Sequence, residues 1–141
     1  MAIKHGMNVL LDLAELGAPF QITGLGSSQR FFAQRRPTAI KFMQAFVEGI
    51  QDYKPHKPES MRVIAKYMKV NDRDALSATY DYFAPRIVPR KPCSSLQGVK
   101  ALLDLAANEK PEARNLPPKR FVNTTILKEV DESGFIDRLY R

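Results

Sequence analysis

The chain has 141 residues, of which 44% are hydrophobic and 26% charged, and its formal net charge is +7. This length and composition are typical of one soluble domain, and no uninterrupted run of about 18 apolar residues that would span a membrane occurs. Cys93 is the only cysteine, which excludes an internal disulfide and a cysteine-based metal cluster. We therefore expect residues 1–141 to form a single domain.

Two short segments near the N-terminus have the pattern of β-strands. Asn8 to Leu13 is a compact apolar run that suits a buried strand, and residues 17–19 (Gly-Ala-Pro) interrupt it. From Phe20 to Leu25 apolar residues alternate with polar ones, which predicts a second extended segment. Residues 24–28 contain two glycines and two serines, and they predict a turn.

Ten prolines and several capping residues divide the rest of the chain into five or six predicted helices. A short helix is expected to end at Gln34 after a serine cap, because a serine side chain accepts a hydrogen bond from the first turn. Pro37 suits the first turn of the next helix, whose apolar residues recur at helical spacing from Ile40 to Ile50. The later helices are predicted from Pro58 to Met68, Arg73 to Phe83, Leu96 to Ala107 and Ile126 to Glu132, and Phe135 to Tyr140 closes the chain. The predicted fold class is α+β and mostly α-helical.

The turn Gly24-x-Gly26-Ser27-Ser28 has the composition of an anion-binding loop. Backbone N–H groups at a helix start, with hydroxyls beside them, suit phosphate, sulfonate or carboxylate. A dinucleotide-binding fingerprint is excluded because no third glycine stands three residues after Gly26. The alternative is a hinge turn in which glycine supplies a positive φ. Both interpretations stay open.

Catalytic and metal chemistry are not indicated. The two histidines, His5 and His56, are remote in sequence from Cys93, and the paired carboxylates fall at helix ends, where capping and solvation explain them. Tyr80 and Tyr82 could stack on an aromatic ligand, although packing along a helix is the commoner role. We expect no enzymatic activity, no catalytic residue, no metal site and no cofactor.

An ordered set of short segments extends over nearly the whole chain. It consists of Gly6–Asp12 (GMNVLLD), Pro19–Phe20 before Thr23–Leu25, Arg36–Pro37, Phe46–Ile50, Ile64–Tyr67, Tyr80–Tyr82 and Gly134–Asp137. In this order the segments resemble the C-terminal half of the substrate-binding proteins of bacterial ABC importers. The resemblance is to the type that binds nitrate, sulfonates, taurine or thiamine-pyrimidine precursors.

The resemblance implies a partial domain, the C-terminal portion of a two-lobed fold of the type II periplasmic-binding-protein kind. Asn8 to Leu13 would complete a strand of the second lobe, Phe20 to Leu25 would cross the hinge, and the helices would pack on the first lobe. The implied function is the capture of a small anionic or aromatic solute and its delivery to a membrane permease. The family is periplasmic. This chain has no recognisable secretory signal, because Asp12 and Glu15 interrupt its first apolar run, so it would be cytoplasmic as given.

The resemblance also places the turn near the cleft between the lobes. It implies that Thr23, Ser27 and Ser28 are the ligand-binding residues of this chain. Gly26 departs from the pattern, since the family usually has hydroxyl residues directly after the Gly-Leu pair.

Two other function classes fit the sequence. A stand-alone helical interaction module would self-associate as a dimer or larger homo-oligomer, because the apolar stripe from Ile40 to Ile50 needs a cover. A basic nucleic-acid binder would use Arg30, Arg35 and Arg36 together with Phe31 and Phe32. The basic residues are spread along the chain, however, so we expect no specific nucleic-acid binding.

Overall fold

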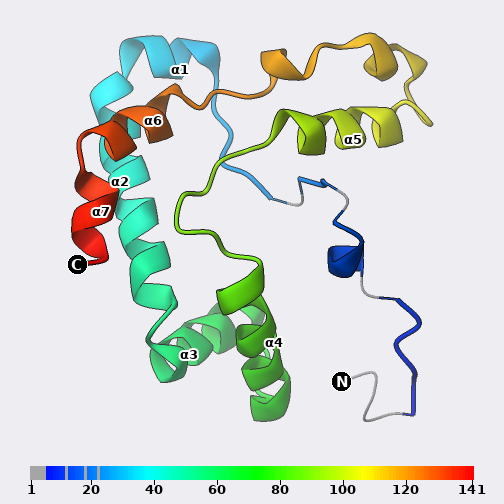
Figure 1. Cartoon of the computed structure of the whole chain (residues 1–141), viewed down its shortest axis with the longest axis vertical. Coiled ribbons are helices and arrows are strands. Elements are labelled where there is room, and N and C mark those ends of the chain that lie inside the picture. Colours follow the sequence, from blue (N-terminus) through cyan, green and yellow to red (C-terminus); the bar gives the residue numbers. More distant parts are fainter. Residues whose placement is uncertain (1–5, 12, 18, 22) are drawn as a thin grey trace. The chain divides into compact units, whose positions relative to one another are not determined.

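A computed structural model describes residues 6–11, 13–17, 19–21 and 23–141 (Figure 1). All regular structure in these residues is helical, with seven α-helices, three short 3-10 helices and no β-strand. In chain order the elements are η2 (Leu13–Leu16), α1 (Gln29–Gln34), α2 (Arg36–Tyr53), α3 (Lys57–Met68), α4 (Arg73–Arg86), α5 (Leu96–Ala106), η3 (Pro111–Asn115), η4 (Pro118–Arg120), α6 (Thr125–Glu132) and α7 (Phe135–Leu139). None of these helices is long and apolar enough to cross a membrane.

The chain divides into two compact units. The first unit consists of Met1–Gly26 and Cys93–Thr124, and the second of Ser27–Pro92 and Thr125–Arg141. The expectation that residues 1–141 form a single domain stays a prediction.

The core of the second unit lies where α2 packs against α6 and α7 (Figure 1). Val47, Leu127, Val130 and Ile136 are its buried side chains, and none of them is more than 7% exposed. Partly buried side chains complete it: Ile40, Met43, Phe135, Leu139 and Tyr140. The apolar stripe of α2 is therefore covered by helices of the same chain. Self-association is predicted from the need of this stripe for a cover, and the chain itself supplies that cover. The oligomeric state stays a prediction.

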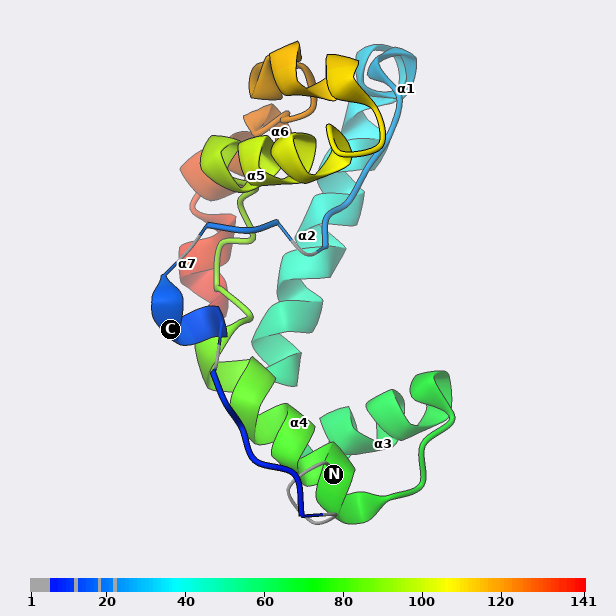
Figure 2. The same ribbon diagram turned by 90° about the vertical axis from the view of Figure 1, so that its right-hand side faces the viewer.

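A second packing region of the same unit brings α3 and α4 side by side, as both ribbon views show (Figures 1 and 2). Pro58 lies in the first turn of α3, where its missing N–H leaves no helical bond unmade. Asp72 caps α4, since its Oδ1 accepts hydrogen bonds from the N–H groups of Asp74 and Ala75, both at 3.0 Å. Lys69 ends α3 in the left-handed region with φ of +53°.

In the first unit α5 packs against η3 and η4. Ser95 caps α5 by accepting a hydrogen bond from the Gly98 N–H at 2.8 Å. A Cβ on Gly98 would lie 3.0 Å from the backbone nitrogen of Gln21 and 3.3 Å from the carbonyl carbon of Phe20. The absence of a side chain at Gly98 therefore allows the segment at Phe20 and Gln21 to lie directly against α5.

The two predicted strands are not seen, and the α+β class is corrected to all-helical for the described residues. Residues 8–11 have no regular structure and Leu13 begins η2, while residues 19–21 and 23–28 are irregular. The predicted segments also include Asp12 and Ile22, which lie outside the described residues. A strand needs the backbone of a second strand to satisfy its N–H and C=O groups, and the described residues supply none.

The helix predictions are mostly confirmed. The serine-capped helix is α1, and Ser28 is its cap, with its Oγ accepting from the Phe31 N–H at 3.1 Å. Five or six helices are predicted, and the described residues form seven α-helices. The prediction that the third long helix ends at Phe83 is wrong, because α4 continues to Arg86 with Pro85 inside it.

Candidate functional site

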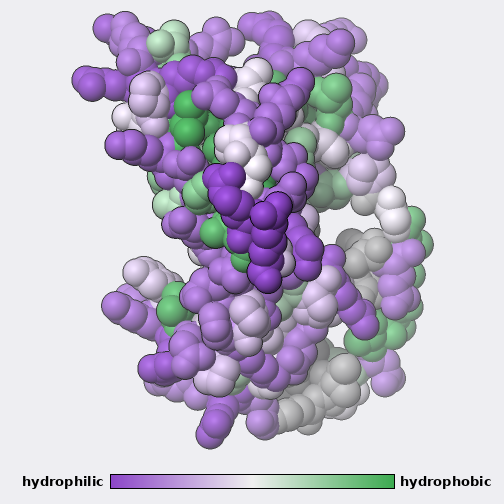
Figure 3. Space-filling view, turned by 60° about the vertical axis from the view of Figure 1, so that its left-hand side comes forward, coloured by the Kyte–Doolittle hydropathy of each residue, from purple (hydrophilic) through white to green (hydrophobic). Residues whose placement is uncertain are grey.

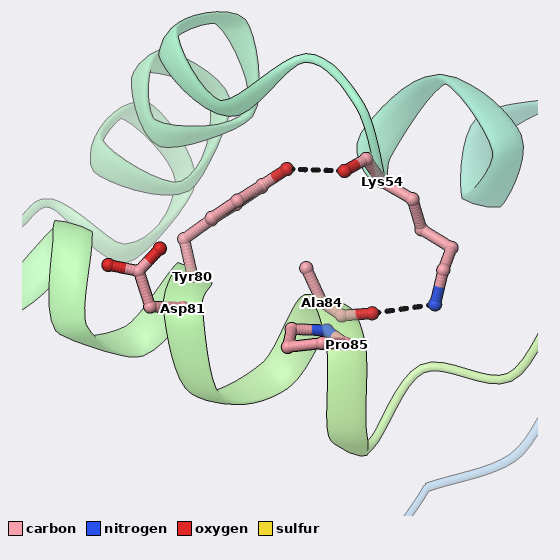
Figure 4. A pocket seen from close by; sticks show the side chains of 5 residues that line it. All are labelled: Lys54, Tyr80, Asp81, Ala84 and Pro85. Carbon is pink, nitrogen blue, oxygen red and sulfur yellow. Dashed lines mark hydrogen bonds between the residues drawn. The ribbon is translucent and has the colours of Figure 1, made fainter.

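The second unit contains a hollow of about 360 Å³ beside the end of α2 and the C-terminal half of α4 (Figure 4). Lys54, Tyr80, Asp81, Ala84 and Pro85 line it. Lys54 follows the last residue of α2, and the other four residues belong to α4. Figure 4 shows the Tyr80 ring and the Lys54 side chain on opposite sides of Ala84.

Helical spacing places Tyr80 at this position. Leu76, Tyr80 and Ala84 recur every four residues and form the buried face of α4. The Tyr80 hydroxyl donates a hydrogen bond to the Lys54 carbonyl oxygen at 2.6 Å, and its ring meets that of Tyr53 edge to face at 5.3 Å between centroids. These contacts hold the aromatic wall of the hollow against the end of α2.

The Lys54 side chain caps the C-terminus of α4. Its Nζ donates hydrogen bonds to the carbonyl oxygens of Ala84 at 2.6 Å and Val88 at 2.7 Å. The N–H of Val88 bonds to Phe83, five residues back, instead of to Ala84, so the Ala84 carbonyl is left for Lys54. The last carbonyls of a helix lack helical donors, and a lysine is a suitable partner for them.

Two further features set the polarity of the hollow. The Asp81 carboxylate binds the Lys57 ammonium through both oxygens at 2.7 Å, so each neutralises the other's charge. Pro85 has no N–H, and the Asp81 carbonyl therefore lacks the helical donor that another residue at position 85 would supply. The hollow thus combines apolar walls with the ammonium group of Lys54.

Tyr53 lies directly behind this wall. Burial raises the pKa of Tyr53 above its ordinary value of 10.0, and the electrostatic interaction with Tyr80 raises that pKa further. The Tyr53 carbonyl oxygen also accepts a hydrogen bond from the Ser60 hydroxyl at 3.0 Å, which ties the end of α2 to α3.

The predicted ligand-binding residues are divided between the two units. Thr23 belongs to the first unit, whereas Ser27 and Ser28 belong to the second. All three are exposed. The Ser28 hydroxyl is engaged in capping α1, and the backbone oxygen of Thr23 accepts a hydrogen bond from the Gln21 side chain. Their role in ligand binding stays a prediction.

The predicted basic cluster is partly neutralised. Arg36 donates from Nε to Glu129 of α6 at 3.0 Å, and Arg30 bonds to Gln34 within α1. The rings of Phe31 and Phe32 meet edge to face at 6.2 Å between centroids. Arg36 thus links α2 to α6 through its ion pair with Glu129.

Side chains with catalytic or metal-binding potential are dispersed. His56 pairs with Asp52, one turn earlier in the sequence, at 2.8 Å, and Cys93 is exposed. In the part of the chain that the structure describes, no group of three or more His, Cys, Asp or Glu residues is placed to hold a metal ion.

Sequence reasoning considered Tyr80 but missed Lys54 and the hollow. Lys54 and the two carbonyls it binds are separated by 30 and 34 residues. No local pattern encodes such a contact. The one available signal is Pro85, which lies in the last turn of α4, beyond the predicted helix end at Phe83.

Comparison with known proteins gives no relative. No protein-family model matches the chain, and neither a curated protein nor a solved structure matches it significantly.

Proposed function

We propose that this chain is the C-terminal, mainly helical portion of a solute-binding protein of an ABC importer. The observation that carries the proposal is the state of the two extended segments near the N-terminus. Where the resemblance places strands, Val9, Leu10 and Leu11 are exposed, and so are Phe20 and Leu25. Apolar residues in this pattern are typical of strands that belong inside a sheet.

The helices support the same proposal. Segments that the resemblance assigns to packing helices lie in α2, α3 and α4, within the second unit, which has its own core. The extended segments, in contrast, require a partner backbone. A sheet supplied by the other portion of a two-lobed protein would provide that partner and would cover the apolar side chains.

The mechanism is hinge-bending capture. Two lobes close on a small solute, and the closed form is recognised by a membrane permease. Phe20 to Leu25 is the hinge crossing in this proposal, and the hydroxyls of Thr23, Ser27 and Ser28 face the solute. Because most of the cleft belongs to the other portion, the chain by itself binds solute weakly or not at all.

The first test is to read the coding sequence next to this chain in its source genome and to express the adjoining segment together with it. We expect that segment to encode a sheet-rich lobe. Amide hydrogen exchange of residues 8–11 and 23–25 should be fast in the chain alone and slow in the joined protein, since pairing protects strand amides. Amides in α2 serve as the internal control, because their hydrogen bonds are formed in both.

Calorimetric titration of the joined protein with nitrate, taurine and a pyrimidine precursor then tests the solute. Binding that is weakened in a Thr23→Ala or Ser27→Ala variant would support the assigned residues. An adjoining sequence without such a lobe, or unchanged exchange of residues 8–11 in the joined protein, would overturn the proposal.

The alternative is a helical module that self-associates. The observation in its favour is a set of large exposed apolar side chains on the second unit: Phe42, Val63, Tyr67, Met68 and Phe83. On the face drawn in Figure 3, hydrophobic residues (green) are separated by hydrophilic ones (purple) and form no broad patch. Light scattering after gel filtration distinguishes the alternatives, because a module of this kind has at least twice the mass of one chain.

A further inference from the structure

We propose that the hollow beside the end of α2 binds a small carboxylate with a flat apolar body. This site lies entirely within the second unit and shares no residue with the predicted cleft. The inference is therefore independent of the transport function proposed above.

The first argument is the unused hydrogen-bonding capacity of Lys54. An ammonium group carries three N–H donors. Two of them bind the carbonyl oxygens of Ala84 and Val88, which leaves one donor for a ligand. The two oxygens are neutral, so they satisfy hydrogen bonds without cancelling the charge of Lys54.

The second argument is the charge balance of the hollow. Asp81 is the one carboxylate among the lining residues, and it is bound to Lys57 through both oxygens. Lys54 and Lys57 contribute two positive charges and Asp81 one negative charge, which leaves one positive charge. A ligand anion supplies the charge that the hollow lacks, and an ammonium–carboxylate hydrogen bond is stronger than one between neutral groups.

The third argument is the shape and polarity of the walls. The Tyr80 ring, the Ala84 methyl group and the Pro85 ring present apolar surface next to the Lys54 ammonium (Figure 4). A volume of about 360 Å³ is at the lower end of the range of small-molecule sites. One aromatic ring with a carboxylate matches both the volume and this pairing of apolar and charged surface.

Two-dimensional NMR of the full chain, titrated with sodium benzoate, tests the proposal. We expect the amide signals of Tyr80, Asp81 and Ala84 to shift with a dissociation constant on the order of millimolar, as a ligand this small allows. Benzamide has the same ring and no charge, and we expect it to bind about tenfold more weakly.

The matched variants are Lys54→Gln and Lys41→Met. Glutamine retains an N–H donor for the Ala84 carbonyl but removes the charge, so benzoate should then bind no better than benzamide. Lys41 is exposed on α2 outside the hollow, and its replacement should leave benzoate binding unchanged.

Equal binding of benzoate and benzamide to the unmodified chain would overturn the proposal. This comparison needs no variant and decides the question even if Lys54→Gln fails to fold. Shifts that are confined to residues outside α4 and the end of α2 would overturn it as well.

Discussion

The helical core of the second unit and the extended N-terminal segment of the first unit expose their large apolar side chains to opposite degrees. Val47, Val130 and Ile136 are at most 1% exposed, whereas Leu10 is 96% exposed. A helix satisfies its own backbone hydrogen bonds, so its apolar face needs only side chains of another helix as a cover. A strand needs the backbone of another strand. Helices can therefore form a core within this chain, whereas the apolar residues of segment 8–11 remain exposed.

The largest expected effect comes from the same truncation made in both regions. Leu127→Ala in the core of the second unit should lower the free energy of unfolding by about 2–5 kcal/mol, because it removes buried methyl groups and leaves a cavity. Leu10→Ala should change it by less than about 0.5 kcal/mol. Urea denaturation followed by helical circular dichroism measures both. Equal losses would show that the N-terminal segment is packed as tightly as the core.

The next prediction concerns the close contact of Phe20 and Gln21 with α5. Gly98→Ala should destabilise the first unit by about 1–3 kcal/mol, because the new Cβ meets the Ser95 hydroxyl at 2.8 Å and the Gln21 nitrogen at 3.0 Å.

Gly49→Ala is the matched control, measured in the same urea denaturation. Gly49 lies within α2, and no atom outside its own helix backbone lies within 4 Å of the position that an added methyl group would take. Alanine should therefore stabilise the helix by about 0.5–1 kcal/mol. Stabilisation by both substitutions would mean that the segment at Phe20 and Gln21 is not held on α5.

A smaller effect is expected at the end of α3. Lys69→Gly should raise the free energy of unfolding by about 0.5–1 kcal/mol, because glycine adopts the left-handed conformation at this position without steric conflict. Lys66→Gly, within the same helix, should lower it by about 1 kcal/mol. Thermal unfolding of the two variants gives the comparison, and a loss of stability in both would contradict the assigned end of α3.

The smallest effect is a dependence of stability on high pH. The folded state holds the Tyr53 proton more tightly than the unfolded state, because burial and Tyr80 raise the pKa of Tyr53. The contribution of this residue is therefore fully present below the unfolded pKa of about 10 and is lost as the pH rises through the folded pKa. Urea midpoints of the unmodified chain should fall across this range more steeply than those of Tyr53→Phe. Tyr67→Phe, at an exposed position, should retain the slope of the unmodified chain.

The helices could be predicted closely because their signals are local. The spacing of apolar residues from Ile40 to Ile50 and the early Pro37 predict most of α2, and a serine before Gln29 predicts the cap of α1. The same kind of local pattern predicted strands that the described residues do not form. The alternation from Phe20 to Leu25 specifies which side chains would share a face, but it does not supply the neighbouring strand.

The sequence by itself determined most of the helical segments, the serine cap of α1 and the apolar stripe of α2, because these depend on residues within one or two turns of each other. Only the tertiary structure decided that α6 and α7 cover the stripe of α2, that Pro85 lies within a helix, and that Lys54 reaches the end of α4. The contacts of Lys54 join residues 30 and 34 positions apart, and the contact of Arg36 with Glu129 joins residues 93 positions apart. They depend on how whole helices pack, which no local pattern encodes.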